Sequence, residues 1–197
     1  MRAIEVVEYD PSWPERFEEE SNLLRETLGD IAVEVHHIGS TAVPGLAAKP
    51  IIDILIEVAD LAALDARNRD MELIGYEPKG EFGMPGRRYF QKGGDNRTHQ
   101  IHAFVAGDVN VSRHIAFRDY LRSNPGVAEE YGTLKKKVAE TCDNDIEKYC
   151  DGKDAFVKNH EEIAERLKAT KKALQCTQTS RTVELWRRTA LVSNTSE

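Results

Sequence analysis

The sequence predicts an α/β (α+β) protein in which a mixed β-sheet is flanked by helices and followed by a helical C-terminal third. Residues 51–58 form a continuous aliphatic run, which indicates a strand buried on both faces. Segments at 31–38, 87–91 and 97–105, in which β-branched, aromatic and polar residues are mixed, predict further strands. From about residue 110 onward the spacing of the apolar residues becomes helical. A sheet that is completed before the last third of the chain is therefore expected.

Start and stop signals place the helices. Ser12 is expected to cap a first helix that ends at Gly29, and Asp60 a second helix that ends near Gly75. The helical periodicity of the last third predicts three more helices, at 111–122, at 125–142 with a proline in its first turn, and at 146–174 with a break near Gly152.

Two smaller features concern the sheet. A short strand is expected at residues 3–7, and Gly93-Gly94-Asp95-Asn96 is typical of a hairpin turn. The strand at 97–105 should therefore return antiparallel to the strand at 87–91.

The length of 197 residues fits one domain, which we expect to span residues 1–174. With 40% hydrophobic residues the chain can bury an ordinary core. Residues 175–197 are polar and without pattern, apart from Val183-Glu184-Leu185-Trp186. This composition predicts a C-terminal tail with one short docking helix.

Composition restricts the partners. A formal net charge of −7 argues against non-specific binding of nucleic acid, although it does not fix where the charges lie. The three cysteines lack a zinc-ligand spacing and indicate no disulfide framework. The sequence contains neither the apolar core of a secretory signal at its start nor the ~20 apolar residues that span a bilayer. We expect a cytoplasmic protein whose partner is a small molecule, with no membrane contact.

The most informative segment joins the first two predicted strands of the sheet. The first ends at Gly39-Ser40-Thr41, a loop of small residues that carries Lys49 follows, and the second contains a single acid, Asp53. Glycine allows a close approach of the backbone to a ligand, and Ser40 can offer its hydroxyl and amide to an anion. A carboxylate inside an apolar strand is costly unless a cation, a metal or hydrogen-bond donors meet it. The segment predicts a phosphate-holding loop beside an acid that can hold a metal.

This segment resembles the signature of the GrpB family, whose proteins are similar in fold to nucleotidyltransferases. Further blocks that resemble the family follow in the expected order, and together they cover roughly residues 4–170: Tyr9-Asp10-Pro11-Ser12-Trp13-Pro14, Gly86-Arg87-Arg88-Tyr89-Phe90, Arg97-Thr98-His99 through His102, and Phe117-Arg118-Asp119-Tyr120-Leu121. The resemblance implies a nucleotidyltransferase-like sheet. It also implies a Gly-Ser turn against a triphosphate and two acids, in an acid-x-acid pattern, that hold magnesium.

The chain departs from that pattern at Leu55, where the second acid is expected. Leucine cannot bind magnesium, and Glu57 lies roughly 13 Å from Asp53 along an extended strand at ~3.3 Å per residue. Two-metal catalysis, simple ligand binding and a structural role for Asp53 therefore all remain open. In the structural role, Asp53 would cap the amides of the loop or pair with Lys49 or an arginine.

His102 is the candidate for a partner of Asp53. Alternation puts Gln100, His102 and Phe104 on one face of their strand, so His102 stands beside Asp53 if the two strands are neighbours. An Asp53–His102 pair would favour zinc or manganese over magnesium, or acid–base work near pH 7. Relatives in the family often carry a second histidine where this chain has Gln100. A hydrogen-bonded core histidine is the alternative.

Arginines and lysines supply the expected ligands for an anion. Lys49 and Arg88 are the preferred ones, and Phe90 shares a strand face with Arg88, so that phosphate could lie on the guanidinium and a base on the ring. Arg87 and Tyr89 share the other face of that strand. The run Lys135-Lys136-Lys137 is expected to be a solvated helix face.

Three functions remain open from the sequence. The first is a protein that binds a nucleotide and transfers a nucleotidyl group with a divalent metal (Mg, Mn or Zn) on Asp53. The residues expected to hold the nucleotide are Gly39, Ser40, Thr41, Lys49, Arg88 and Phe90. The second is a non-catalytic module for a nucleotide or phosphorylated metabolite. Some GrpB-like domains are fused to dephospho-coenzyme A kinase, which implies a link to coenzyme A metabolism. The third is a hydrolase or lyase that uses Asp53 and His102 around a transition metal.

Overall fold

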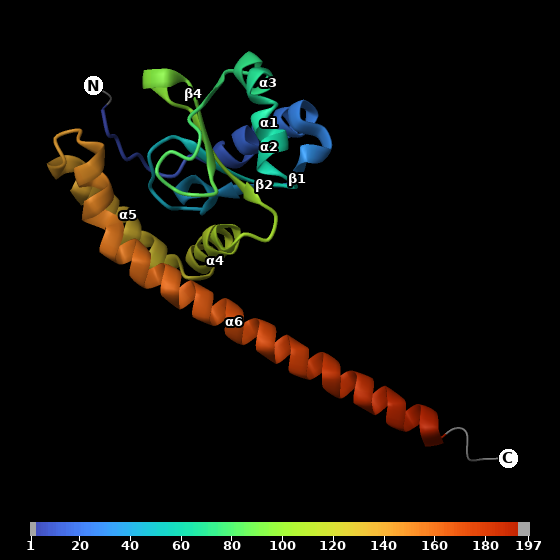
Figure 1. Ribbon diagram of the computed structural model, residues 1–197. Helices are drawn as coiled ribbons and strands as arrows, with labels where there is room; N and C mark the ends of the chain where they lie inside the picture. The colour runs from blue at the N-terminus through green and yellow to red at the C-terminus, as the bar shows by residue number, and fades with distance from the viewer. Residues whose placement is uncertain (1–2, 193–197) are drawn as a thin grey trace.

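A five-stranded mixed sheet forms the centre of the protein, with the strand order β1-β2-β5-β4-β3 (Figure 1). The computed structural model describes residues 3–192, with side chains as far as residue 171. β2 and β5 are parallel, and the other neighbouring pairs are antiparallel. The strands are β1 (Ala32–Ile38), β2 (Ile52–Val58), β3 (Tyr76–Pro78), β4 (Arg88–Lys92) and β5 (His99–Val105). The predicted mixed sheet is confirmed, including the antiparallel return of β5 along β4.

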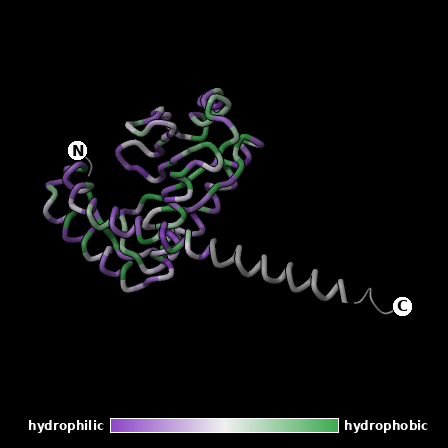
Figure 2. Tube along the Cα trace, turned by 60° about the horizontal axis from the view of Figure 1, so that its bottom comes forward, coloured by the Kyte–Doolittle hydropathy of each residue, from purple (hydrophilic) through white to green (hydrophobic). Residues whose placement is uncertain are grey.

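Helices cover both faces of the sheet. Three lie against one face and form the main core with it: α1 (Trp13–Leu28), α2 (Leu61–Asp65) and α3 (Asn68–Leu73). The helical third follows β5 and consists of α4 (Val109–Ser123), α5 (Pro125–Thr141) and α6 (Ile146–Val192), with α4 packed on the other face. Short 3-10 turns lie at Gly29–Ile31, Ser40–Ala42 and Gly94–Asn96. Figure 2 shows hydrophobic residues concentrated along the central strands.

Alternation along β2 separates the two faces. Ile52, Ile54, Ile56 and Val58 point into the core with α1 to α3, and each is 0% exposed. Asp53 and Leu55 therefore point to the opposite face, where Leu55 packs with Val111 of α4. This second face carries the candidate site.

Several elements differ from the prediction in physically clear ways. The single helix expected from Asp60 is divided into α2 and α3, and the Arg67 side chain between them donates to the carbonyl oxygen of Thr27. The strand expected at residues 3–7 is reduced to one bridge, in which Val7 exchanges two 2.9 Å hydrogen bonds with Ala48. Helix α6 passes Gly152 without a break. A Cβ there would lie 2.6 Å from Cγ1 of Val138, so the glycine allows α5 and α6 to pack closely.

Helix α6 continues to Val192 and thus covers most of the segment that we expected to be a tail. Residues 193–197 of that predicted tail lie outside the described residues. Within the described part of the chain, none of the helices has the length and apolar character that crossing a membrane requires.

Candidate functional site

The candidate site begins where β1 ends and the chain turns at Gly39. Its φ of +69° and ψ of −168° belong to a region that is essentially restricted to glycine. A Cβ on Gly39 would lie 2.5 Å from Oδ2 of Asp53 and 3.0 Å from its Cβ. The carboxylate of Asp53 is therefore packed directly against the backbone of the Gly39–Ser40 turn, as the sequence led us to expect.

Asp53 itself is half-buried. Burial raises the pKa of its carboxyl to about 6, because removing the charged form from water is costly, and the positive charges of Lys49, Lys153 and Lys135 oppose this rise. Three ammonium groups thus lie within electrostatic range of one carboxylate. They come from the loop before β2, from α6 and from α5 respectively.

Lys135 is the most unusual of these lysines. It is 2% exposed, its ammonium donates a 2.7 Å hydrogen bond to Oγ of Ser40, and it lies 4.5 Å from the centroid of the Tyr131 ring. Burial, followed by the charges of Lys153 and Lys49, lowers the pKa of Lys135 to about 7, although Asp53 acts in the opposite direction. The prediction that this residue lies on a solvated helix face is wrong.

The helical third therefore forms one wall of the site. Lys49 places its ammonium 4.8 Å from the ring centroid of Tyr149, and Lys153 follows Tyr149 by one turn of α6 and is half-buried. Burial raises the pKa of both Tyr131 and Tyr149, so both rings carry neutral hydroxyl groups at physiological pH. The result is a group of lysines held between the Gly-Ser loop and two tyrosines.

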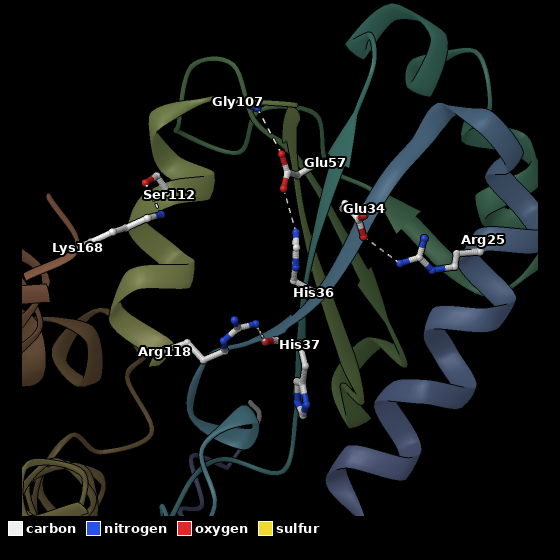
Figure 3. A network of polar contacts seen from close by, with 9 residues as sticks. All are labelled: Arg25, Glu34, His36, His37, Glu57, Gly107, Ser112, Arg118 and Lys168. Atoms are coloured by element: carbon white, nitrogen blue, oxygen red, sulfur yellow. Dashed lines mark hydrogen bonds and ion pairs between the residues drawn. The ribbon is translucent and has the colours of Figure 1, made fainter. Parts of the chain in front are cut away.

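The acids that a two-metal site needs are not at this place. Leu55 is 0% exposed, and Glu57 is engaged further along β2, where its carboxylate contacts Nε2 of His36 at 2.9 Å and accepts from the amide of Gly107 at 3.3 Å (Figure 3). In residues 3–171, no group of three or more His, Cys, Asp or Glu side chains could hold a metal ion. One aspartate surrounded by lysines does not fit a magnesium pair, which requires several oxygen ligands.

The structure does not bring His102 beside Asp53. The parallel register of β2 and β5 pairs Asp53 with Gln100, and His102 with Leu55. His102 instead lies 3.5 Å from a guanidinium nitrogen of Arg87, and its ring centroid is 5.5 Å from that of His114. Burial, followed by the charges of His114 and the nearby arginines, lowers the pKa of His102 to about 3. The register therefore places Gln100, and not His102, directly beside Asp53.

Arg88 and Phe90 lie on the far side of the sheet from Asp53. Arg88 makes two hydrogen bonds, of 2.6 and 2.7 Å, to the carboxylate of Asp65, and Phe90 is 1% exposed within the main core. The register shows that the other pair of the same strand, Arg87 and Tyr89, lies on the face that carries Asp53. Alternation had grouped these residues correctly, but it could not tell which group faces the site.

Thr41 is buried beneath the Gly39–Ser40 turn and contacts β1. It is 1% exposed, and its hydroxyl lies 3.0 Å from Nε2 of His37. Burial, followed by the charges of Arg122 and Arg118, lowers the pKa of His37 to about 4. The guanidinium of Arg118 also donates to the carbonyl oxygen of His37 at 3.1 Å (Figure 3). Of the predicted ligand-binding residues, the structure thus groups Gly39, Ser40 and Lys49 around Asp53, with Thr41 buried behind them.

Two lysines of the site, Lys135 and Lys153, were not predicted. A signal for Lys135 existed in the sequence, because Ala128, Tyr131, Gly132 and Lys135 follow the i, i+3, i+4, i+7 spacing of a buried helix stripe, and all are buried. The adjacent lysines of the same run obscured it.

Fold and site together define an α/β protein with a five-stranded mixed sheet, in which a Gly-Ser loop and lysines of a helical third surround one aspartate. The chain belongs to the GrpB family, because the family model described as GrpB protein matches residues 3–163. The crystal structure of the conserved protein GrpB from Enterococcus faecalis is similar, with a TM-score of 0.78 and 48% identity over 81% of this chain and 96% of that chain.

Curated relatives are also similar. The UPF0157 protein YqkA of Bacillus subtilis is 47% identical over 85% of this chain, and the match spans 49% of that protein. The chain therefore spans about half the length of this relative. The dephospho-CoA kinase of Mycobacterium bovis is 29% identical over 77% of this chain and 43% of that protein.

Proposed function

We propose that this chain binds a phosphate-bearing ligand, and specifically a nucleotide, at the site formed by Ser40, Lys49, Lys135 and Lys153. The observation that carries the proposal is Lys135, a buried ammonium that donates to the Ser40 hydroxyl and lies within electrostatic range of two further lysines. Asp53 offers one negative charge to three lysines, and burying this excess of positive charge is unfavourable unless a further anion completes the site. These three lysines lie close together in a chain whose net charge is −7.

A polyphosphate suits this arrangement better than a single carboxylate. Three ammonium groups offer up to nine N–H donors, and a polyphosphate has enough oxygens and negative charge to accept from several of them. The lysines would neutralise the phosphates without the second acid that a metal pair requires. The same binding mode serves a nucleotide and a phosphorylated metabolite, and the likeness to a dephospho-CoA kinase adds dephospho-coenzyme A to the ligands worth testing.

Titration calorimetry with inorganic tripolyphosphate in metal-free buffer tests the proposal. Lys135→Met removes the buried charge but keeps an unbranched apolar stem, so affinity is expected to fall about tenfold to a hundredfold, the range for hydrogen bonds to charged groups. Measurement at pH 8 in two buffers of different ionisation enthalpy adds a second readout. Because the pKa of Lys135 is about 7, binding should take up about one proton more in the natural protein than in Lys135→Met.

Lys136→Met is the matched control. Lys136 is the next residue of α5, but its side chain is 40% exposed and pairs with Glu8, so its replacement should leave tripolyphosphate affinity within about twofold. Affinity that survives Lys135→Met, or no binding by the natural protein, would contradict the proposal.

Nucleotidyl transfer is a second candidate function, and one observation favours it. Asp53 is half-buried with a pKa near 6, which suits a general base at physiological pH. It would accept the proton of an acceptor hydroxyl while that oxygen bonds to the α-phosphorus and pyrophosphate leaves. Pyrophosphate release from nucleoside triphosphates, supplied with a panel of hydroxyl acceptors, should then fall at least a hundredfold in Asp53→Asn. Unchanged release in that variant would leave only the binding function.

A further inference from the structure

An aromatic pair, Phe82 and Tyr89, lies on the same sheet face as the lysine site. Phe82 is 58% exposed, although it is a large apolar side chain. Its ring stacks on that of Tyr89, with centroids 4.9 Å apart and planes inclined by 13°. Tyr89 itself is 4% exposed. The outer face of this stack is therefore formed by Phe82 alone.

The loop between β3 and β4 holds the backbone of Phe82 in an unfavourable conformation. Its φ of +45° is rare for a bulky residue and must be stabilised by its surroundings. Arg87 supplies this support, because its guanidinium donates to the carbonyl oxygens of Phe82 at 2.6 Å and Glu81 at 3.2 Å. The same guanidinium lies 5.1 Å from the centroid of the Tyr89 ring. Strain that is maintained by a buried arginine points to a role for the exposed ring.

One hydrogen bond joins the stack to Gln100, the residue beside Asp53 in the sheet. The hydroxyl of Tyr89 donates to Oε1 of Gln100, and Gln100 is the register partner of Asp53 on the neighbouring strand. Tyr89 is also close enough to Asp53 for the carboxylate to act on its hydroxyl electrostatically. The aromatic pair and the lysine site thus lie on the same face of the sheet, on either side of Gln100 and Asp53.

We propose that Phe82, backed by Tyr89, is the stacking surface for the base of a nucleotide whose phosphates lie on Lys135, Lys153 and Lys49. The inference rests on the proposed function and adds the part of the site that would hold the base of the nucleotide. Stacking suits a nucleobase because every base presents a flat π-face, and an aromatic partner accepts it with little dependence on sequence. The strained loop presents the ring before the ligand arrives, which lowers the entropy cost of binding.

The test compares three ligands that share a triphosphate and differ in the nucleoside, which inorganic tripolyphosphate lacks. Titration calorimetry measures the affinity of ATP, UTP and inorganic tripolyphosphate for the natural protein, Phe82→Ala and Phe82→Trp. Phe82→Ala should weaken both nucleoside triphosphates about tenfold and leave tripolyphosphate unchanged, because only the base contacts the ring. Phe82→Trp should retain or strengthen the binding of both nucleotides. Leu73→Ala is the matched control, since Leu73 is 77% exposed but lies on α3, across the sheet.

The outcomes separate this inference from the proposed function. If the nucleotides and tripolyphosphate bind the natural protein equally, and Phe82→Ala changes neither, the stacking surface is refuted and the phosphate site stands. If the natural protein binds none of the three, both ideas are refuted. Thermal unfolding shows whether Phe82→Ala is folded. If it is not, Phe82→Trp still tests the stacking surface, because its larger ring should retain or strengthen nucleotide binding and leave tripolyphosphate binding unchanged.

Discussion

Replacing Gly39 by alanine is expected to lower the free energy of unfolding by about 4 kcal/mol, since two separate costs add. The first is the backbone, because a φ of +69° with a ψ of −168° is strained for any residue with a Cβ. The second is steric, because the new Cβ would lie 2.5 Å from Oδ2 of Asp53. Asp53 cannot easily move, since its own Cβ is only 3.0 Å away and its backbone is fixed between β1 and β5.

Gly45→Ala separates the two costs. Gly45 has a φ of +78°, but a Cβ there would meet nothing within 4 Å, so this variant tests the backbone cost without the clash. Urea unfolding, followed by the fluorescence of buried Trp13, measures the free energy of unfolding of each variant. We expect Gly45→Ala to lower it by about 1 kcal/mol, much less than Gly39→Ala.

A double variant tests the contact itself. Gly39→Ala combined with Asp53→Ala removes Oδ2, the atom nearest to the new methyl group, and leaves the Cβ contact at 3.0 Å, so the two changes should cost about 2 kcal/mol less together than the sum of the single variants. Additive effects would show that Asp53 does not pack against the turn.

Local pattern predicted the loop and its acid, because both depend on neighbours in the sequence. A strand that stops at Gly39 and a buried strand that contains Asp53 must bring the turn and the acid together if the two strands pair, which they do. The register of β5 could not be predicted in the same way. A shift of two residues leaves every side chain on its proper face, so hydrophobicity cannot distinguish Gln100 from His102 as the neighbour of Asp53.

The residues of β4 alone likewise did not determine which of its two faces points to the main core. Arg88 with Phe90, and Arg87 with Tyr89, form two groups of almost the same chemistry, so alternation alone assigns neither to the core. Tertiary contacts determine the orientation. Arg88 donates hydrogen bonds to the carboxylate of Asp65 on α2, while Arg87 donates to the backbone carbonyl oxygens of Glu81 and Phe82. Lys135 illustrates the same limit. Its burial depends on Ser40, which lies far away in the sequence.

The last prediction concerns acid. Between about pH 6 and pH 4.5 the free energy of unfolding is expected to fall steeply, because His37, His102 and His114 have pKa values of about 4, 3 and 4 in the folded protein. Burial is the main cause of each lowered pKa, and nearby positive groups add to it. Arg122 and Arg118 act on His37. Arg87 and Arg113 act on both His102 and His114, and His114 also acts on His102. The unfolded chain protonates its histidines near pH 6.5 and therefore binds more protons, so acidification favours unfolding.

Asp53 acts with the opposite sign over the same range. Its pKa is raised to about 6 in the folded protein, whereas the unfolded value is near 3.8, so the folded state binds the extra proton and gains stability as the pH falls. These three histidines and Asp53 together give a net release of about two protons on folding at pH 5, so the free energy of unfolding should change by about 3 kcal/mol per pH unit. Burial also lowers the pKa of His99, which acts in the same direction as the other histidines.

Urea unfolding at closely spaced pH values measures this slope, and two variants change it in opposite directions. His37→Gln should reduce the number of linked protons at pH 5 from about two to about one, whereas Asp53→Asn should raise it to about three. Both variants also alter packing, but a packing change lowers stability equally at every pH and leaves the slope alone. Equal slopes in all three proteins would show that these residues titrate alike in the folded and unfolded states. Opposite changes would place a neutral His37 and a partly protonated Asp53 on either side of the Gly-Ser turn under mildly acidic conditions.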